Sequence, residues 1–178
     1  LWVRTGTHPE AVTLTPGVAL YAGFAGIEGT RDERDPAAAT IIDATGFATH
    51  AVVGADGARL DGFTITGGDA GNGGGVYSAE GALTLVGCTI RGNRAAQDGA
   101  GVYAGGRVRL ERCRIENNVS LRDGGGVAAI GDTSLAGCLV IGNRAVNGAG
   151  IYGRMLASAD NCIVTGNVAT ANGGGLYD

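Results

Sequence analysis

Apolar and polar positions alternate along short segments of this chain, and the alternation returns about every 25 residues from residue 51 onward. Successive side chains of a strand point to opposite faces, so a position that is apolar in every copy marks the buried face. Three such columns recur, with a less regular fourth. They are Leu60, Leu85, Leu110, Leu135 and Ala159; Phe63, Cys88, Cys113, Cys138 and Cys162; Ile65, Ile90, Ile115, Val140 and Val164; and Leu83, Val108, Thr133 and Ala157.

Each copy holds three short segments of this kind, for example 75–78, 82–86 and 88–91, separated by glycine-rich or polar corners. A repeat of this size has no room for three strands and a packed helix. We therefore predict an all-β solenoid with about 25 residues and three short parallel strands per coil, each coil burying its apolar side chains against its neighbours.

An asparagine follows each cysteine by five residues, at Asn93, Asn118, Asn143 and Asn167. Asparagine tolerates the left-handed backbone that a sharp corner needs, and stacked amides can hydrogen-bond along the axis. We interpret these residues as a corner ladder rather than as ligands.

The four cysteines, Cys88, Cys113, Cys138 and Cys162, are separated by 25, 25 and 24 residues. Neighbouring strands lie about 4.8 Å apart, whereas a disulfide brings its β-carbons to about 3.8 Å, so bridging stacked positions needs a local distortion. Free, buried thiols are the favoured interpretation, and a disulfide framework is the alternative.

We treat residues 1–178 as a single β-helix domain, with irregular first coils at 1–50 and regular coils at 51–178. A charged loop at 25–39 interrupts the first coils. Its signs alternate at residues 28–35, which is typical of a self-paired, solvated excursion, although loops on rigid scaffolds also carry function.

Composition narrows the class further. Among 178 residues there are 35 glycines but only 3 prolines. The glycines recur with a period of about 25 residues, which excludes collagen and disordered low-complexity sequence. The net charge of −4 leaves no basic footprint for nucleic acid. No apolar run is long enough to span a membrane. The chain starts at Leu1, so we expect a portion of something longer, with end coils that either continue or stack between molecules in a homo-assembly.

Residues 16–24, 40–43 and 60–68, followed by the repeated Cys-x-Ile-x-Gly-Asn element, carry a family resemblance. Over residues 15–178 the chain resembles right-handed parallel β-helix repeat proteins of bacterial surfaces, including those with polymorphic outer-membrane-protein-like repeats. The resemblance implies a right-handed single-stranded helix, which the chirality of parallel crossovers also favours. It also implies an extracellular or bacterial cell-surface location. It leaves activity open, because this architecture hosts adhesins, lyases and stalks.

One coil is rich in arginine on positions predicted to face outward. The candidate binding residues are Arg91, Arg107, Arg109, Arg112, Arg114 and Glu116, with Glu111 beside them. Arginine can hold acidic sugars through paired hydrogen bonds, and a carboxylate base beside it suits a polysaccharide lyase. The alternative is an ordinary cross-strand ion pair between Arg91 and Glu116.

Other breaks in the repeat are weaker candidates. Asp98 and Asp123 precede glycine turns in adjacent coils, where they either form turns or share a calcium ion. A group of apolar residues at outward positions suits an interface. It contains Leu139, Ile141 and Ile163.

An aromatic column either stacks on itself or supports a sugar ring. It contains Tyr77, Tyr103, Tyr152 and Tyr177. The two histidines, His8 and His50, have no metal-ligand spacing, so no cofactor is expected beyond that calcium ion.

Two functions from different classes fit these observations. The favoured hypothesis is a non-enzymatic structural or adhesive module that self-assembles end to end. The alternative is a polysaccharide-binding or lyase-like protein that uses the arginine-rich face.

Overall fold

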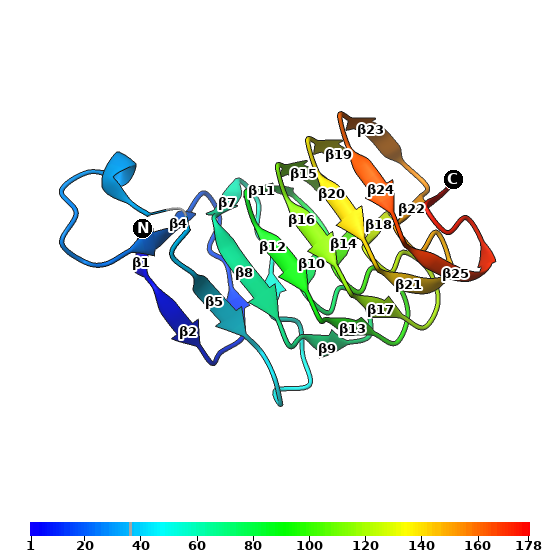
Figure 1. Cartoon of the computed structure of the whole chain (residues 1–178), viewed down its shortest axis with the longest axis horizontal. Coiled ribbons are helices and arrows are strands. Elements are labelled where there is room, and N and C mark those ends of the chain that lie inside the picture. The colour runs from blue at the N-terminus through cyan, green and yellow to red at the C-terminus, as the bar shows by residue number, and fades with distance from the viewer. Residues whose placement is uncertain (36) are drawn as a thin grey trace.

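The computed structural model describes residues 1–35 and 37–178, apart from the side chain of Ala157. The chain winds into a stack of parallel coils with the two termini at opposite ends (Figure 1). Each strand pairs with the equivalent strand of the coil before and after it, so every sheet runs along the stack. The only helical element described is one 3₁₀ turn at Arg31–Glu33, and among the residues described no helix is long and apolar enough to cross a membrane.

Three long sheets form the walls. Sheet A contains β1 (Trp2–Arg4), β4 (Ala19–Phe24), β7 (Ala58–Asp61), β11 (Ala82–Val86), β15 (Arg107–Glu111), β19 (Thr133–Ala136) and β23 (Leu156–Asp160). Sheet B contains β2 (Gly6–His8), β5 (Thr40–Asp43), β8 (Phe63–Thr66), β12 (Thr89–Arg91), β16 (Arg114–Glu116), β20 (Leu139–Ile141) and β24 (Ile163–Thr165). Sheet C contains β3 (Val12–Thr13), β6 (Val52–Val53), β10 (Val76–Ser78), β14 (Val102–Ala104), β18 (Val127–Ala129), β22 (Ile151–Gly153) and β26 (Leu176–Tyr177).

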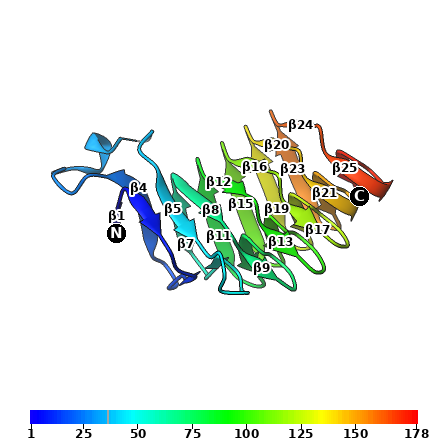
Figure 2. The ribbon, with the colours of Figure 1, turned by 60° about the horizontal axis from the view of Figure 1, so that its bottom comes forward.

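A fourth, shorter sheet lies between B and C and was not among the three predicted strands. Sheet D contains β9 (Asp69–Ala70), β13 (Arg94–Ala95), β17 (Val119–Ser120), β21 (Arg144–Asn147) and β25 (Val168–Asn172). Its strands follow one another along one edge of the stack (Figures 1 and 2). These strands directly follow the stacked asparagines. Because the asparagines hold the coils in register, the residues after them lie side by side and their backbones pair.

The predicted interior columns are confirmed in the regular coils. Leu60, Leu85, Leu110 and Leu135 are fully buried. So are Ile90, Ile115 and Val140, and Cys88, Cys113 and Cys138 are at most 2% exposed. The last coil differs: Ala159 is exposed, and Cys162 and Val164 are only partly buried. These residues have a neighbouring coil on one side only.

The asparagine ladder is confirmed, with one correction to its backbone. The side-chain amide nitrogens of Asn93, Asn118 and Asn143 each donate to the side-chain oxygen of the next asparagine at 3.0 Å. The left-handed residue of each corner is not the ladder asparagine but the residue before it, which is glycine except at Asn117, where φ is 53°.

All four thiols are free, as predicted. The Cys113 Sγ lies 3.4 Å from the carbonyl oxygens of Leu85 and Glu111, so the thiol can donate to the backbone. Hydrogen bonds with the neighbouring thiols of Cys138 and Cys88, together with burial, raise the pKa of Cys113. A raised pKa keeps the buried Cys113 thiol uncharged, so it packs as a small apolar side chain.

The described part of the charged loop extends past the first coil at the amino-terminal end (Figure 1). Arg31 and Asp32 pair within it, at 3.5 Å between Nε and Oδ1. The Glu28 carboxylate accepts hydrogen bonds from the backbone N–H groups of Ala25, Gly26 and Ile27, which lower its pKa to about 2. Self-pairing thus accounts for this part of the loop.

Candidate functional site

The arginine-rich set does not lie on one outer face. Arg107 and Arg109 project from β15 on sheet A, whereas Arg114 and Glu116 project from β16 on sheet B. Exposed Arg112 lies in the corner between them, with a left-handed φ of 51°. The candidate residues of this coil therefore occupy two sheets and the corner between them, because the chain changes sheet between residues 111 and 114.

The predicted ion pair between Arg91 and Glu116 is also replaced. These two residues are opposite one another in the register of β12 and β16. However, the Glu116 Oε2 lies 2.6 Å from Nη2 and 2.7 Å from Nε of Arg114. Residues two positions apart in a strand project from the same face. Glu116 therefore pairs with Arg114 of its own strand rather than with Arg91 of the neighbouring strand.

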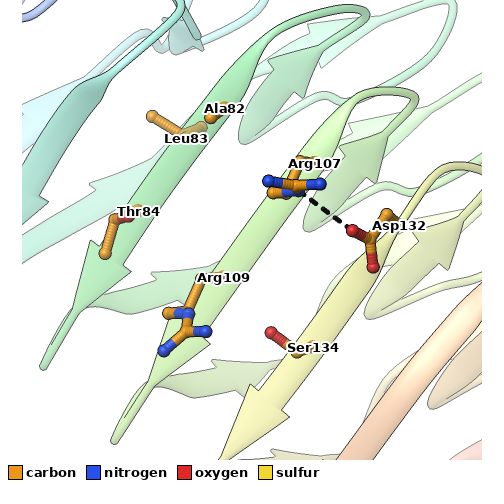
Figure 3. A pocket seen from close by; sticks show the side chains of 7 residues that line it. All are labelled: Ala82, Leu83, Thr84, Arg107, Arg109, Asp132 and Ser134. Atoms are coloured by element: carbon orange, nitrogen blue, oxygen red, sulfur yellow. Dashed lines mark hydrogen bonds and ion pairs between the residues drawn. The ribbon is translucent and has the colours of Figure 1, made fainter.

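A groove runs over the outer face of sheet A. One cavity of about 330 Å³ is lined by Ala82, Leu83, Thr84, Arg107, Arg109, Asp132 and Ser134 (Figure 3). A second, of about 120 Å³, is lined by Arg109, Glu111, Ser134, Leu135, Ala136, Ser158 and Asp160. Because the two share Arg109 and Ser134, we treat them as one feature, the sheet A groove. It crosses strands of four successive coils, from β11 to β23.

Four of the five charged side chains of the groove form two ion pairs. The Arg107 Nε lies 3.0 Å from the Asp132 Oδ2, as the dashed line in Figure 3 marks. The Arg109 Nη1 lies 3.7 Å from the Glu111 Oε1. The arginine side chains are 75% and 64% exposed, so each pair contributes about 0–1 kcal/mol and is easily rearranged.

A carboxylate on β7, one coil before the first strand of the groove, is held much more tightly. The Asp61 carboxylate is 2.7 Å from Nη2 of both Arg34 and Arg59, and its side chain is 8% exposed. Burial alone raises the pKa of Asp61, but the hydrogen bonds and charges of Arg34 and Arg59 outweigh burial and lower it. Arg34 thereby anchors the charged loop onto sheet A, a contact that the sequence analysis missed.

A second ladder, also missed, lies beside the glycine turns. The amide nitrogens of Asn147 and Asn172 donate to the side-chain oxygens of Asp123 and Asn147 at 2.8 and 2.9 Å. The Arg122 guanidinium clamps Asp98, with Nε 2.8 Å from Oδ1 and Nη2 bonded to Oδ2. The sequence signal was an arginine placed 24 residues after a turn aspartate, which puts it in the next coil.

This clamp bears on the expected calcium ion. Both oxygens of Asp98 are engaged by N–H donors, so calcium would have to displace Arg122. Within residues 1–35 and 37–178, no group of three or more His, Cys, Asp or Glu side chains lies close enough to hold a metal ion. A calcium ion shared by Asp98 and Asp123 therefore stays a prediction, and it requires Arg122 to release Asp98.

Comparison with known proteins settles the family. A family model described as a right-handed β-helix region matches residues 40–177. The chain belongs to the right-handed β-helix family. No curated protein and no solved structure matches the chain.

On sheet C of this β-helix, the aromatic column stacks on itself. The Tyr77 ring lies 5.3 Å from the Tyr103 ring and 4.5 Å from the imidazole of His50, centroid to centroid. His50 belongs to the preceding coil and Tyr103 to the following one, so both faces of Tyr77 are covered. Tyr77 therefore offers no free ring face on which a sugar could stack.

The outward apolar positions of the β-helix lie together on sheet B. Leu139 and Ile163 are register neighbours on β20 and β24, and Ile141 is on the same face of β20. Ile163 is 62% exposed, whereas Leu139 and Ile141 are half-buried. We call this small group the sheet B patch. Its most exposed residue, Ile163, lies on the last coil.

Proposed function

We propose that this β-helix is a non-enzymatic structural and adhesive module of an extracellular or cell-surface protein. The recurrent polar residues, Asn93, Asn118 and Asn143 above all, are used to hold one coil on the next. Stacking thus explains why these residues recur, which favours a scaffold as the purpose of the repeat. The location rests on the resemblance to repeats of bacterial surface proteins.

The observation that carries the non-enzymatic assignment is the pairing of carboxylates in the sheet A groove. In the lyase-like alternative, a carboxylate next to an arginine is the base that removes a proton beside a uronate, and it must be free to accept that proton. Asp132 and Glu111 instead face Arg107 and Arg109. The remaining carboxylate, Asp160, comes from β23, two coils beyond the Arg109 strand, and lines the smaller cavity together with Arg109.

The direct test is incubation of the protein with acidic and neutral polysaccharides, followed for new reducing ends and unsaturated products. We expect neither to form. Glu111→Gln and Asp132→Asn serve as matched variants, because product formation that these variants abolish would overturn the assignment. For location, protease treatment of intact cells that express the protein should cleave this β-helix.

Self-assembly is part of the same proposal. The strands at the two ends of the stack have unpaired edges, and the sheet B patch adds apolar surface. We expect the mass measured by light scattering to rise with protein concentration, and Ile163→Asn to weaken the rise if the patch contributes. A monomer at the highest concentration would overturn this part alone.

A second candidate, polysaccharide binding, is favoured by the sheet A groove itself. It combines guanidinium, carboxylate and hydroxyl groups over four coils of a rigid sheet. Binding on a glycan array, reduced by Arg109→Ala, supports this candidate. An array without any ligand leaves only the structural role.

A further inference from the structure

The sheet A groove carries hydrogen-bond donors and acceptors in a balanced mixture. Its donors are the guanidinium groups of Arg107 and Arg109, and its acceptors are the carboxylates of Glu111, Asp132 and Asp160. Thr84, Ser134 and Ser158 add hydroxyls that do both. A ligand rich in hydroxyl groups matches such a surface, because each hydroxyl also donates and accepts.

The charge of the groove argues against an acidic ligand. Two arginines face three carboxylates, so the lining has a formal charge of −1. A uronate polymer would have to displace Asp132 from Arg107 or Glu111 from Arg109 and would then lie beside the displaced carboxylate. Like charges at this distance repel, whereas a neutral hydroxyl can insert between donor and acceptor without that repulsion.

Arg109 is best placed to hold such a ligand. It lines both cavities of the groove, and its single ion pair is long, at 3.7 Å from Nη1 to the Glu111 Oε1. A guanidinium has five N–H donors, so most of those on Arg109 remain available. Figure 3 shows its side chain beside Ser134, on the next strand.

The shape of the groove sets the direction of the ligand. The lining residues come from β11, β15, β19 and β23, so the groove crosses the strands and follows the axis of the stack. Three inter-strand spacings of about 4.8 Å give a length of about 14 Å. That length suits several sugars of a linear chain rather than one.

We infer that the sheet A groove binds a neutral, linear glycan lying along the solenoid axis, with hydroxyls of one sugar bridging Arg109 and Ser134. This inference rests on the polysaccharide-binding candidate and specifies its ligand class.

The test is calorimetric titration of the folded protein with β-1,4-linked glucose and mannose oligosaccharides of two to six sugars, with oligogalacturonates as the acidic comparison. Affinity for a neutral series should rise with length, level off when the groove is filled, and change little with salt. Arg109→Ala should weaken binding at least tenfold. Ala136→Trp, which keeps every charge but fills the groove floor, should do the same.

Arg94→Ala is the matched control, because Arg94 is also an exposed arginine but lies on β13 of sheet D, away from the groove. It should leave binding unchanged, and thermal unfolding of all variants checks that they are folded. Salt-sensitive binding of oligogalacturonates alone would overturn the neutral ligand while keeping polysaccharide binding. Failure of both series would overturn the inference and the candidate function together. An equal loss in Arg94→Ala would overturn the location.

Discussion

The side-chain oxygen of Asn143 accepts two hydrogen bonds from Asn118, one from the backbone N–H and one from the side-chain amide, each at 3.0 Å. The same amide nitrogen of Asn118 also lies 3.0 Å from the carbonyl oxygen of Ile90. The buried side chain of Asn118 thus pairs with backbone and side-chain groups of the coils before and after its own. The corner can turn inside the protein because these groups are paired.

Asn118→Ala should therefore lower the free energy of unfolding by about 3 kcal/mol, because it removes the partner of the Asn93 backbone N–H and one partner each of the Asn93 amide and the Ile90 carbonyl. Urea unfolding followed by circular dichroism measures the change. Asn117→Gly is the control: Asn117 has a φ of 53°, and glycine there restores the corner of the other coils. Its effect should stay within about 1 kcal/mol, and a loss in Asn118→Ala that is no larger would contradict the ladder's role.

The glycine turns should be sensitive to size at the position that touches the next coil. At Gly126 a β-carbon would lie 2.5 Å from the carbonyl oxygen of Gly150 and 3.1 Å from the amide nitrogen of Asn143. Gly126→Ala should thus cost about 2–3 kcal/mol through overpacking. Gly71→Ala, where no atom lies within 4 Å of the added carbon, should change stability by less than about 0.5 kcal/mol. Equal effects of the two substitutions would show that contact between coils is not the cause.

The interior of this β-helix was predictable because each coil repeats the environment of the last. Leu85 and Leu110 face the same neighbours one coil apart, so the pattern of one position over several copies reveals its burial. The asparagine ladder was predictable for the same reason. Stacking converts a period in the sequence directly into contacts in space.

Outward side chains carried no such constraint, and there the predictions failed. Glu116 had two arginines within reach, Arg91 across the strands and Arg114 along its own strand, and spacing alone did not decide between them. The contact of Arg34 with Asp61 joins a loop to a strand 27 residues away, outside the repeat. Long flexible side chains select partners by local geometry that a column pattern does not contain.

Acid should weaken the anchor of the charged loop. The pKa of Asp61 is lowered in the folded protein, so its ionised carboxylate stabilises the fold above the ordinary aspartate value of about 4, and this contribution is lost as pH falls through the lowered value. Asp61→Asn should cost about 2 kcal/mol at pH 7 and progressively less below pH 4. Unfolding measured at several pH values tests this.

Asp32→Asn provides the comparison for Asp61. Asp32 pairs with Arg31 within the loop, but its side chain is 89% exposed, so its loss should change little at any pH. A difference between wild type and Asp61→Asn that stays constant from pH 7 into acid would mean that the charge of Asp61 does not matter.

Thiol labelling should separate the cysteine column into two classes. Cys88, Cys113 and Cys138 are at most 2% exposed, whereas Cys162, on the last coil, is partly exposed. Burial raises the pKa of Cys162, so even this thiol should react slowly at neutral pH. In the folded protein, a maleimide should therefore modify one cysteine slowly, and all four should react in denaturant. Cys162→Ser should leave the folded protein unlabelled; labelling of two or more sites in that variant would show that the coils open while the protein is folded.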